Sequence, residues 1–241
     1  DLPGAALFPT TFRPEWDSSE TSMPSLTVTL RRALLVVPLA LLSACGLPNL
    51  SAEPTADLST MNVATPPMRW DHRPEADAWT QTAFRALSTH GAALPSLTPA
   101  DIDTWCPGYV DATEAERMAF WTGLISALAK HESTWNPAAV GGGGRWFGLV
   151  QIAPSTARLY GCEAKSGAAL KDGEKNLNCA IRIMARTVPR DGVVSRGMRG
   201  VAADWGPFHS SSKREDMIAW TRAQPYCQPK EKGLIARLTE R

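Results

Sequence analysis

The sequence lacks an excess of charge of either sign. Lys and Arg together number 25 and Asp and Glu number 24 among 241 residues, so the net charge is close to zero. A surface that binds nucleic acid needs a marked positive excess, and the balance of charges therefore argues against such a partner. Hydrophobic residues make up 44% of the chain, which suits an ordinary globular core, and the length is that of one domain with extensions.

Long apolar runs are also scarce. The run Ala33–Leu42 is too short to cross a bilayer well, and it follows Arg31 and Arg32 and ends in small residues. This order is typical of a signal peptide, with a buried helix as the alternative. The residues Leu42–Cys45 read LSAC, which resembles the lipobox of bacterial lipoproteins. The resemblance implies cleavage before Cys45 and lipidation of that cysteine.

The lipobox divides the N-terminal part of the chain. Residues 23–44, beginning at Met23, are the expected lipoprotein signal peptide, and residues 1–22 precede the expected start, as they would if the start codon had been assigned too early. Gly46 in place of Asp after the cysteine implies, by the same resemblance, sorting to the outer membrane of a Gram-negative cell, facing the periplasm. Residues 45–68 are rich in Pro, Ser, Thr and Ala and predict a flexible tether.

The sequence has no Cys-x-x-Cys pair and no two histidines at the spacing of metal ligands, so we expect no zinc site, no other metal and no cofactor. Four cysteines remain besides Cys45. An even number in an exported chain predicts disulfides, and three pairings are possible. We predict Cys162–Cys179 and Cys106–Cys227. The first would close a loop of about 15–20 residues and stabilise the fold by about 3 kcal/mol in the chain-entropy model.

Alternating strand patterns are absent except in WFGLVQI, residues 146–152, so the predicted fold class is mainly α. Thr113 and Glu116 have the spacing of a capping box at the start of the clearest helix, and Asn136–Pro137 stops it. We expect a helical N-terminal extension at 69–108, tied by Cys106 to a helical domain at 109–241. The apolar periodicity places helices at 75–87, 113–130, 153–161, 171–186 and 213–223.

Glu132 continues the apolar face of the helix that begins at Thr113. At 100° per residue, Ile125, Leu128 and Glu132 all lie within about 40° of Trp121, so the acid falls in the middle of the stripe that should face the core. Burial disfavours the ionised carboxylate, and the negative end of the helix dipole acts in the same direction. A carboxylic acid that stays protonated near neutral pH is what general acid catalysis requires.

The alternative is that the Glu132 side chain turns outward or pairs with a neighbouring cation. Lys130 and Arg145 are both close enough in sequence to serve as that partner. His131 lies off the apolar stripe, and we expect it to be a surface residue without a role.

Four glycines, Gly141–Gly144, follow this helix. A phosphate-binding loop needs Lys and then Ser or Thr after its glycines, whereas Arg145 and Trp146 stand there, which argues against nucleotide binding. Glycine lets the backbone approach a ligand closely, so the run next to a buried acid favours a flexible rim on a cleft. A disordered surface loop is the alternative.

Three further side chains are candidates for the cleft. Gln151 lies among apolar residues and needs hydrogen-bond partners if it is buried. It either bonds to the backbone or faces the cleft, where it would hold Glu132 or a sugar amide. Trp146 and Trp205 offer flat apolar faces to sugar rings, although aromatic residues more often belong to the core.

Four motifs in order resemble the lytic transglycosylase family with the goose-lysozyme-like, soluble-transglycosylase catalytic domain. They are HESTWNP, GLVQI, APSTARLYG and NLNCAIRIM, and the likeness runs from about Asp111 to Phe208. GLVQI is similar to the family's Gly-Leu-Met-Gln, with Val150 replacing Met. DIDTWCPGY resembles the leader of lipoprotein members. The resemblance implies a lysozyme-like α-helical domain that acts on peptidoglycan, and we expect a monomer.

The family resemblance also implies a reaction and a set of site residues. It implies cleavage of the β-1,4 bond between N-acetylmuramic acid and N-acetylglucosamine, with Glu132 as the single general acid and base and a 1,6-anhydro product. A second protein carboxylate is then unnecessary, because the sugar's own 6-hydroxyl attacks intramolecularly. The implied substrate contacts are Ser133, Trp146, Val150, Gln151, Asp204 and Trp205.

The sequence departs from the family pattern at two places. ADWGPF, residues 203–208, stands where the family carries Ala-Tyr-Asn, so Ala203 or Asp204 replaces the Tyr and Trp205 would fill the gap. The glycine run also lacks a Ser that the family often carries there. These departures keep three alternatives open: a hydrolytic lysozyme-like glycosidase in which Asp204 orients water, a catalytically silent peptidoglycan-binding lipoprotein, and a structural envelope lipoprotein.

Overall fold

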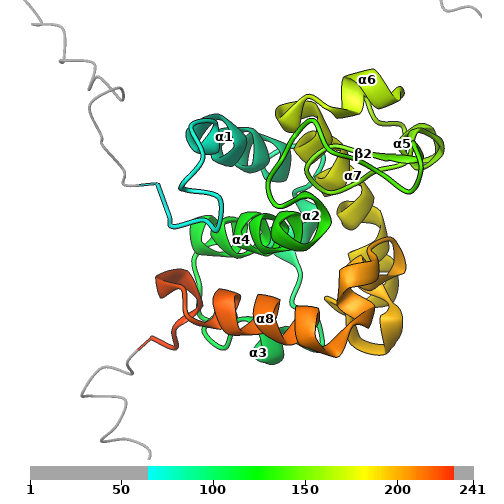
Figure 1. Ribbon diagram of the computed structural model, residues 1–241. Coiled ribbons are helices and arrows are strands. Elements are labelled where there is room, and N and C mark those ends of the chain that lie inside the picture. Colours follow the sequence, from blue (N-terminus) through cyan, green and yellow to red (C-terminus); the bar gives the residue numbers. More distant parts are fainter. Residues whose placement is uncertain (1–64, 231–241) are drawn as a thin grey trace, which may run out of the picture. The chain divides into compact units, whose positions relative to one another are not determined.

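The computed structural model describes residues 65–230, which belong to one compact unit. The predictions for the upstream segment, the signal peptide, Cys45 and most of the tether lie outside the described residues. The described part is mainly helical, as predicted (Figure 1). No helix within it combines the length and the apolar character that crossing a membrane requires.

Helices supply nearly all of the regular structure. The sheet of the described residues has two strands of two residues each, β1 (Val140–Gly141) antiparallel to β2 (Trp146–Phe147). Only β2 lies inside the stretch 146–152 where a strand was predicted, and β1 was not predicted. The α-helices are α1 (Ala76–Leu87), α2 (Ala93–Ser96), α3 (Ile102–Trp105), α4 (Glu114–Ser133), α5 (Pro154–Leu159), α6 (Gly167–Leu170), α7 (Gly173–Asp191) and α8 (Ser211–Arg222). Short 3-10 turns are η2 (Arg196–Met198), η3 (Gly200–Ala203), η4 (Gly206–His209) and η5 (Pro225–Cys227).

Helix α4 is the central element of the fold. Every residue from Ala119 to Ala129 is buried, so its middle is covered on all sides and not only along the predicted stripe. Figure 1 shows α4 between α1 and α8, and it packs against both of them. A sequence this apolar can be buried on all sides only when several helices surround it, which is why α4 orders the packing of the others.

Both ends of α4 have a clear local cause. The predicted capping box is present, with Thr113 Oγ1 accepting from the Glu116 backbone N–H at 3.3 Å and Glu116 Oε2 accepting from the Thr113 N–H at 2.6 Å. The helix runs to Ser133 and ends where Thr134 and Trp135 adopt left-handed backbone angles, with φ of 53° and 56°. Trp135 is fixed there by its indole N–H, which donates to the Ser126 carbonyl at 2.9 Å.

The N-terminal helices pack on the same core as the later ones. Helix α1 lies against α7 and α4, and Trp79 on its buried face is 2% exposed. Asp101, just before α3, accepts hydrogen bonds from three successive backbone N–H groups, those of residues 194–196, at 2.6–2.9 Å. These long-range bonds hold the segment before α4 against the turn that follows α7.

Helix α7 carries the second long face of the core. It begins at Asp172, whose carboxylate accepts from the Lys175 N–H at 3.1 Å, and ends at Gly192, which takes the left-handed conformation at φ 67°. It extends past the predicted end at residue 186, contains Pro189 in its last turn, and ends two residues after that proline.

Both predicted disulfides are present. Cys106–Cys227 joins the segment before α4 to η5 near the end of the described chain, and Cys162–Cys179 joins the loop after α5 to α7. All four cysteines are buried. One bridge therefore ties η5 to the segment before α4, and the other ties the loop after α5 to α7.

Replacing both cysteines of the Cys106–Cys227 bridge with serine should lower the free energy of unfolding more than the same change at Cys162–Cys179. The bridges span 121 and 17 residues, and the chain-entropy model gives losses of about 5 and about 3 kcal/mol. Urea unfolding of the parent and the two double variants, all oxidised, measures both losses. Equal losses, or a larger loss at the shorter bridge, would contradict the prediction.

Candidate active site

Glu132 occupies the next-to-last position of α4, where the buried part of the helix meets the surface. Its side chain is half-buried, and burial raises the pKa of the carboxyl to about 7, while the Lys213 ammonium acts in the opposite direction by a smaller amount. Among residues 65–230 no hydrogen bond or ion pair holds its carboxylate. Glu132 is therefore a carboxyl group that keeps its proton near neutral pH and has that proton available.

The two cations that could have paired with Glu132 are bound elsewhere. Lys130 Nζ donates to Asp216 of α8 at 3.0 Å. Arg145 Nε donates to the Gly142 carbonyl at 2.8 Å, and its guanidinium lies 4.9 Å from the centre of the Trp146 ring. Glu132 therefore does not pair with either of these two cations.

Asp216 is the centre of a charged cluster that fixes the last turn of α4. Arg69 donates to it through both terminal nitrogens at 2.6 and 2.9 Å, and Lys130 and His131 approach it at 3.0 and 2.7 Å. The hydrogen bonds from Arg69, followed by those from Lys130 and His131, hold the pKa of the Asp216 carboxyl well below its usual range. Because two cluster residues directly precede Glu132, the cluster determines where the helix end lies.

His131 was expected at the surface without a role, and this expectation was wrong. Its side chain is only 13% exposed, and its Nε2 lies 2.7 Å from Asp216 Oδ2. The helical projection placed it correctly away from the apolar stripe. It could not show that α8 brings a carboxylate to that side of α4.

Ser133 connects the end of α4 to the GLVQI segment. Its hydroxyl donates to the Leu149 carbonyl at 2.7 Å, with a longer contact to the Ala129 carbonyl at 3.3 Å. The residue after the acid thus holds the next motif in place. Ser133 was predicted to contact substrate, and here its hydroxyl hydrogen is donated within the protein.

Asn176 of α7 fixes the same segment from the other side, and the sequence reasoning did not single it out. Its amide nitrogen donates to the carbonyls of Phe147 and Leu170, and its amide oxygen accepts from the Val150 N–H, each at 3.0 Å. The side chain is fully buried. The available signal was a polar residue on the apolar face of a predicted helix, in the NLNCAIRIM motif.

The close packing around this turn explains one of its glycines. Gly148 has φ of 84°, and a Cβ there would lie 2.1 Å from the Leu170 carbonyl oxygen and 2.3 Å from the Asn176 amide nitrogen. A side chain would therefore break the contact between the turn and α7.

Gln151 has its amide committed to the backbone. It takes a left-handed conformation at φ 50°, and its amide nitrogen donates to the Gly148 carbonyl at 2.9 Å and the Ala139 carbonyl at 3.3 Å. Its side chain nevertheless lines a small pocket. The sequence left two interpretations open, and in the structure the Gln151 amide nitrogen bonds to the backbone.

The structure corrects the roles expected of Val150 and Trp205. The Val150 side chain is 0% exposed, and Trp205 is 3% exposed. The Trp205 indole N–H donates to the Val150 carbonyl at 2.8 Å. Both therefore position the turn from within the core, and neither presents a face on which a sugar ring could stack.

Trp146 and Asp204 do reach the surface beside this turn. Trp146 is 43% exposed and lines the small pocket together with Gln151, Asp204 and the edge of Trp205. The pocket has a volume of about 50 Å³, which suits a substituent of a sugar more than a whole ring. Glu132 does not line it, and the connection between them is the Ser133–Leu149 hydrogen bond and the turn that follows.

Tyr160 is a second residue that sequence reasoning did not place in the site. Its hydroxyl donates to Asp204 Oδ2 at 3.4 Å, and loss of solvent raises the pKa of the Asp204 carboxyl. Tyr160 is the next-to-last residue of the APSTARLYG motif, and its place in that motif was the sequence signal that could have identified it as a site residue. The pair supplies a hydroxyl and a carboxylate at the edge of the pocket beside Trp146.

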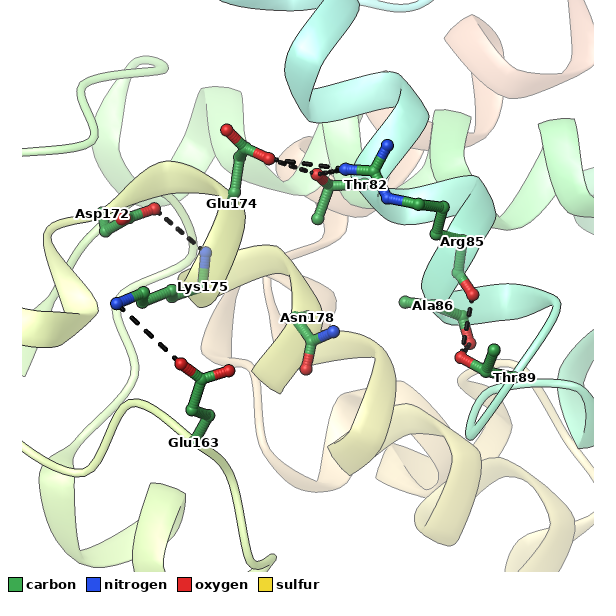
Figure 2. Close-up of a pocket in the computed structure, with 9 residues that line it drawn as sticks. All are labelled: Thr82, Arg85, Ala86, Thr89, Glu163, Asp172, Glu174, Lys175 and Asn178. Atoms are coloured by element: carbon green, nitrogen blue, oxygen red, sulfur yellow. Dashed lines mark hydrogen bonds and ion pairs between the residues drawn. The ribbon is translucent and has the colours of Figure 1, made fainter.

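A larger hollow between α1 and α7 is a poor candidate for the reacting centre. Figure 2 shows its charged side chains paired with one another: Glu174 accepts from Thr82 at 2.6 Å and lies 3.5 Å from Arg85, and Lys175 lies 3.9 Å from Glu163. It shares no lining residue with the pocket beside Trp146. The Glu174 contacts hold α1 to α7, the Lys175–Glu163 contact joins α7 to the loop after α5, and the Asp172 carboxylate accepts from the Lys175 backbone N–H.

A metal centre is not apparent in the described part of the chain. Among residues 65–230, no group of three or more His, Cys, Asp or Glu side chains is arranged to hold a metal ion.

The mainly helical fold of the described residues, with an acid at the end of α4, is consistent with a lysozyme-like domain. Residues 111–194 match the family described as Transglycosylase SLT domain, a range that contains Glu132, Gln151 and Asn176 and stops before Asp204. The chain therefore carries a transglycosylase SLT domain and is a peptidoglycan lytic transglycosylase, a lyase that breaks glycosidic bonds.

Solved structures of the protein Bd0314 DslA are similar to this chain. Two mutants, each with a glutamate changed to glutamine, match with a TM-score of 0.60 and 28% identity, covering 66% and 67% of this chain and 96% and 97% of theirs. The wild-type form 2 matches with a TM-score of 0.58 and 26% identity, covering 68% of this chain and 99% of its own. No curated protein matches the chain.

Proposed function

We propose that the protein is a lipoprotein lytic transglycosylase that cleaves the β-1,4 bond between N-acetylmuramic acid and N-acetylglucosamine and forms a 1,6-anhydro product. Glu132 is its single general acid and base. The observation that carries this proposal is the unpaired, half-buried carboxyl at the end of α4, with a pKa of about 7. The motif resemblance around Glu132 and Gln151 supports the same assignment.

The reaction needs two proton transfers at one carboxyl group. Glu132 first gives its proton to the glycosidic oxygen as the bond from that oxygen to the anomeric carbon breaks. The resulting carboxylate then takes the proton of the 6-hydroxyl on the same muramic acid residue, and the 6-oxygen bonds to the anomeric carbon. An intramolecular nucleophile can reach effective concentrations of about 10⁵–10⁸ M, so no protein nucleophile is required.

A hydrolytic glycosidase is the second candidate, and Asp204 is the observation that favours it. Hydrolases with two carboxyl groups place them about 5–10 Å apart so that the second can act as nucleophile or orient water. Asp204 lines the pocket beside Trp146 and is held by Tyr160. It would serve as that second group, and the product would then carry a reducing end.

The cellular location is part of the proposal and rests on the sequence. The LSAC lipobox supports lipidation of Cys45 and attachment to the outer membrane, facing the periplasm. The segment at 45–68 would then span the distance from the lipid to the catalytic domain. Labelling of cells with a clickable fatty acid, with a Cys45→Ala variant for comparison, tests the attachment.

Changing Glu132 to Gln should reduce the release of soluble fragments from purified sacculi by about 10²–10⁴-fold, because the amide cannot donate the catalytic proton. Glu114→Gln is the matched control, since it makes the same change at the exposed first turn of the same helix and should leave the rate unchanged. Mass spectrometry of the products identifies 1,6-anhydro ends if the proposal holds. Reducing ends would support hydrolysis, and an active Glu132→Gln variant would remove Glu132 from the mechanism.

The pH dependence of cleavage should follow the protonation of Glu132. Below about pH 7 the folded-state carboxyl is protonated and able to donate, and the rate falls as the pH rises through that value. The Lys213 ammonium favours the ionised form, so Lys213→Met should raise the Glu132 pKa further and move the descending limb to higher pH. Lys171→Met, at an exposed lysine remote in sequence, is the control and should not move it. A limb that stays in place, or moves to lower pH, in Lys213→Met would be inconsistent with this role.

A further inference from the structure

A second hollow lies directly across Trp146 from the small pocket. It is formed by the glycine loop, β2, the start of α5 and the start of α6, and Trp146 and Ala153 line both spaces. Its volume is about 530 Å³, within the range of about 300–1,000 Å³ that is usual for ligand sites. A glycan that lies against Trp146 would therefore have room for a large substituent on this side.

The charge of this hollow is entirely positive. Arg145 and Arg158 are the ionisable residues that line it, and no Asp or Glu side chain does. Neither arginine forms an ion pair with a carboxylate of the described residues, whereas Arg85 in the hollow between α1 and α7 faces Glu174 (Figure 2). A cationic hollow without an acid of its own favours a ligand that carries carboxylates.

Both guanidinium groups are already oriented by the protein. Arg145 donates from Nε to the Gly142 carbonyl at 2.8 Å and lies over the Trp146 ring, and Arg158 donates from one terminal nitrogen to the Lys165 carbonyl at 3.1 Å. The remaining N–H groups of both side chains form no other hydrogen bond with the described residues. A carboxylate could accept two of these N–H groups at once, the geometry in which arginine binds most strongly.

The floor of the hollow is apolar and tightly built. Phe147 and Pro154 line it, and Gly167 lies so close to Phe147 that a Cβ at residue 167 would come within 2.5 Å of the ring. At the rim, a Cβ at Gly143 or Gly144 would meet nothing within 4 Å, so the entrance is open. The space therefore suits a short peptide with small apolar side chains and free carboxylates.

We infer that this hollow is a subsite for the acidic stem peptide of the muramic acid residue, with Arg145 and Arg158 binding its carboxylates. The inference rests on the proposed function, because it takes the glycan to lie across Trp146. The stem peptide is attached to muramic acid, the sugar whose bond is cleaved, so a peptide subsite next to the glycan site is where such a group would project. The subsite would make the enzyme favour strands that keep their peptides.

Binding to three soluble glycan probes tests the inference without requiring cleavage. The probes are strands with intact stems, strands from which an amidase has removed the stems, and strands whose stem carboxylates have been converted to amides. The full chain carrying Glu132→Gln is titrated with each probe by calorimetry. Intact strands should bind about tenfold more tightly than the other two, the size expected for charge-assisted hydrogen bonds.

The variant Arg145→Gln/Arg158→Gln in the same background should lose this preference and bind all three probes alike. Arg186→Gln is the matched control, since Arg186 is exposed on α7 and lines neither space, and it should keep the preference. If the double variant does not fold, Arg158→Gln alone should still lower the preference, because the side chain is exposed.

Three results would overturn the inference. They are equal binding of intact and peptide-free strands by the parent, equal binding of amidated and free-carboxylate stems, and a preference that survives in the double variant. The products formed by the wild-type enzyme from sacculi are measured separately. A reducing end there would defeat the proposed reaction while a binding preference for intact stems still supported the subsite.

Discussion

The loss of water around one carboxyl group, that of Glu132, is the constraint on which the chemistry that we propose for this domain depends. Helix α4 is buried throughout its middle, and its last turn places Glu132 at the boundary between that buried region and solvent. The pKa near 7 follows from this placement, because burial removes part of the water that would stabilise the ionised carboxylate, no hydrogen bond from the described residues replaces it, and the Lys213 ammonium offsets only part of the loss. An acid in that state can give up a proton near neutral pH and then take one back, as a single general acid and base must do.

The surroundings of Glu132 are held by bonds that leave its own carboxyl free. The Asp216 cluster fixes the helix end against α8, Ser133 ties it to Leu149, and Asn176 and Trp205 hold the next turn through the Val150 backbone. Several of these bonds are buried, where hydrogen bonds position groups most firmly. The site is therefore built from rigid elements, and Trp146 beside the glycine loop is its exposed aromatic side chain.

The parts of this arrangement that follow from local patterns could be predicted from the sequence. The capping box at Thr113 and the buried acid depend on cap chemistry and periodicity, the even number of cysteines predicts disulfides, and each of these is present in the structure. The pairing itself is one of three that four cysteines allow, so no local pattern determines it. Long-range contacts could not be predicted in this way. His131 contacts Asp216 at a sequence separation of 85, and Tyr160 contacts Asp204 at a separation of 44. The burial of Val150 and Trp205 likewise results from packing that no local pattern encodes.

The most direct test of this account is the titration of the Glu132 carboxyl itself, followed by ¹³C NMR of protein labelled at glutamate and assigned with the Glu132→Gln variant. We predict that the Glu132 carboxyl titrates near pH 7. A Glu132 that titrates at the ordinary value of about 4.5 would contradict it, because the group would then be ionised at neutral pH and have no proton to give to the glycosidic oxygen.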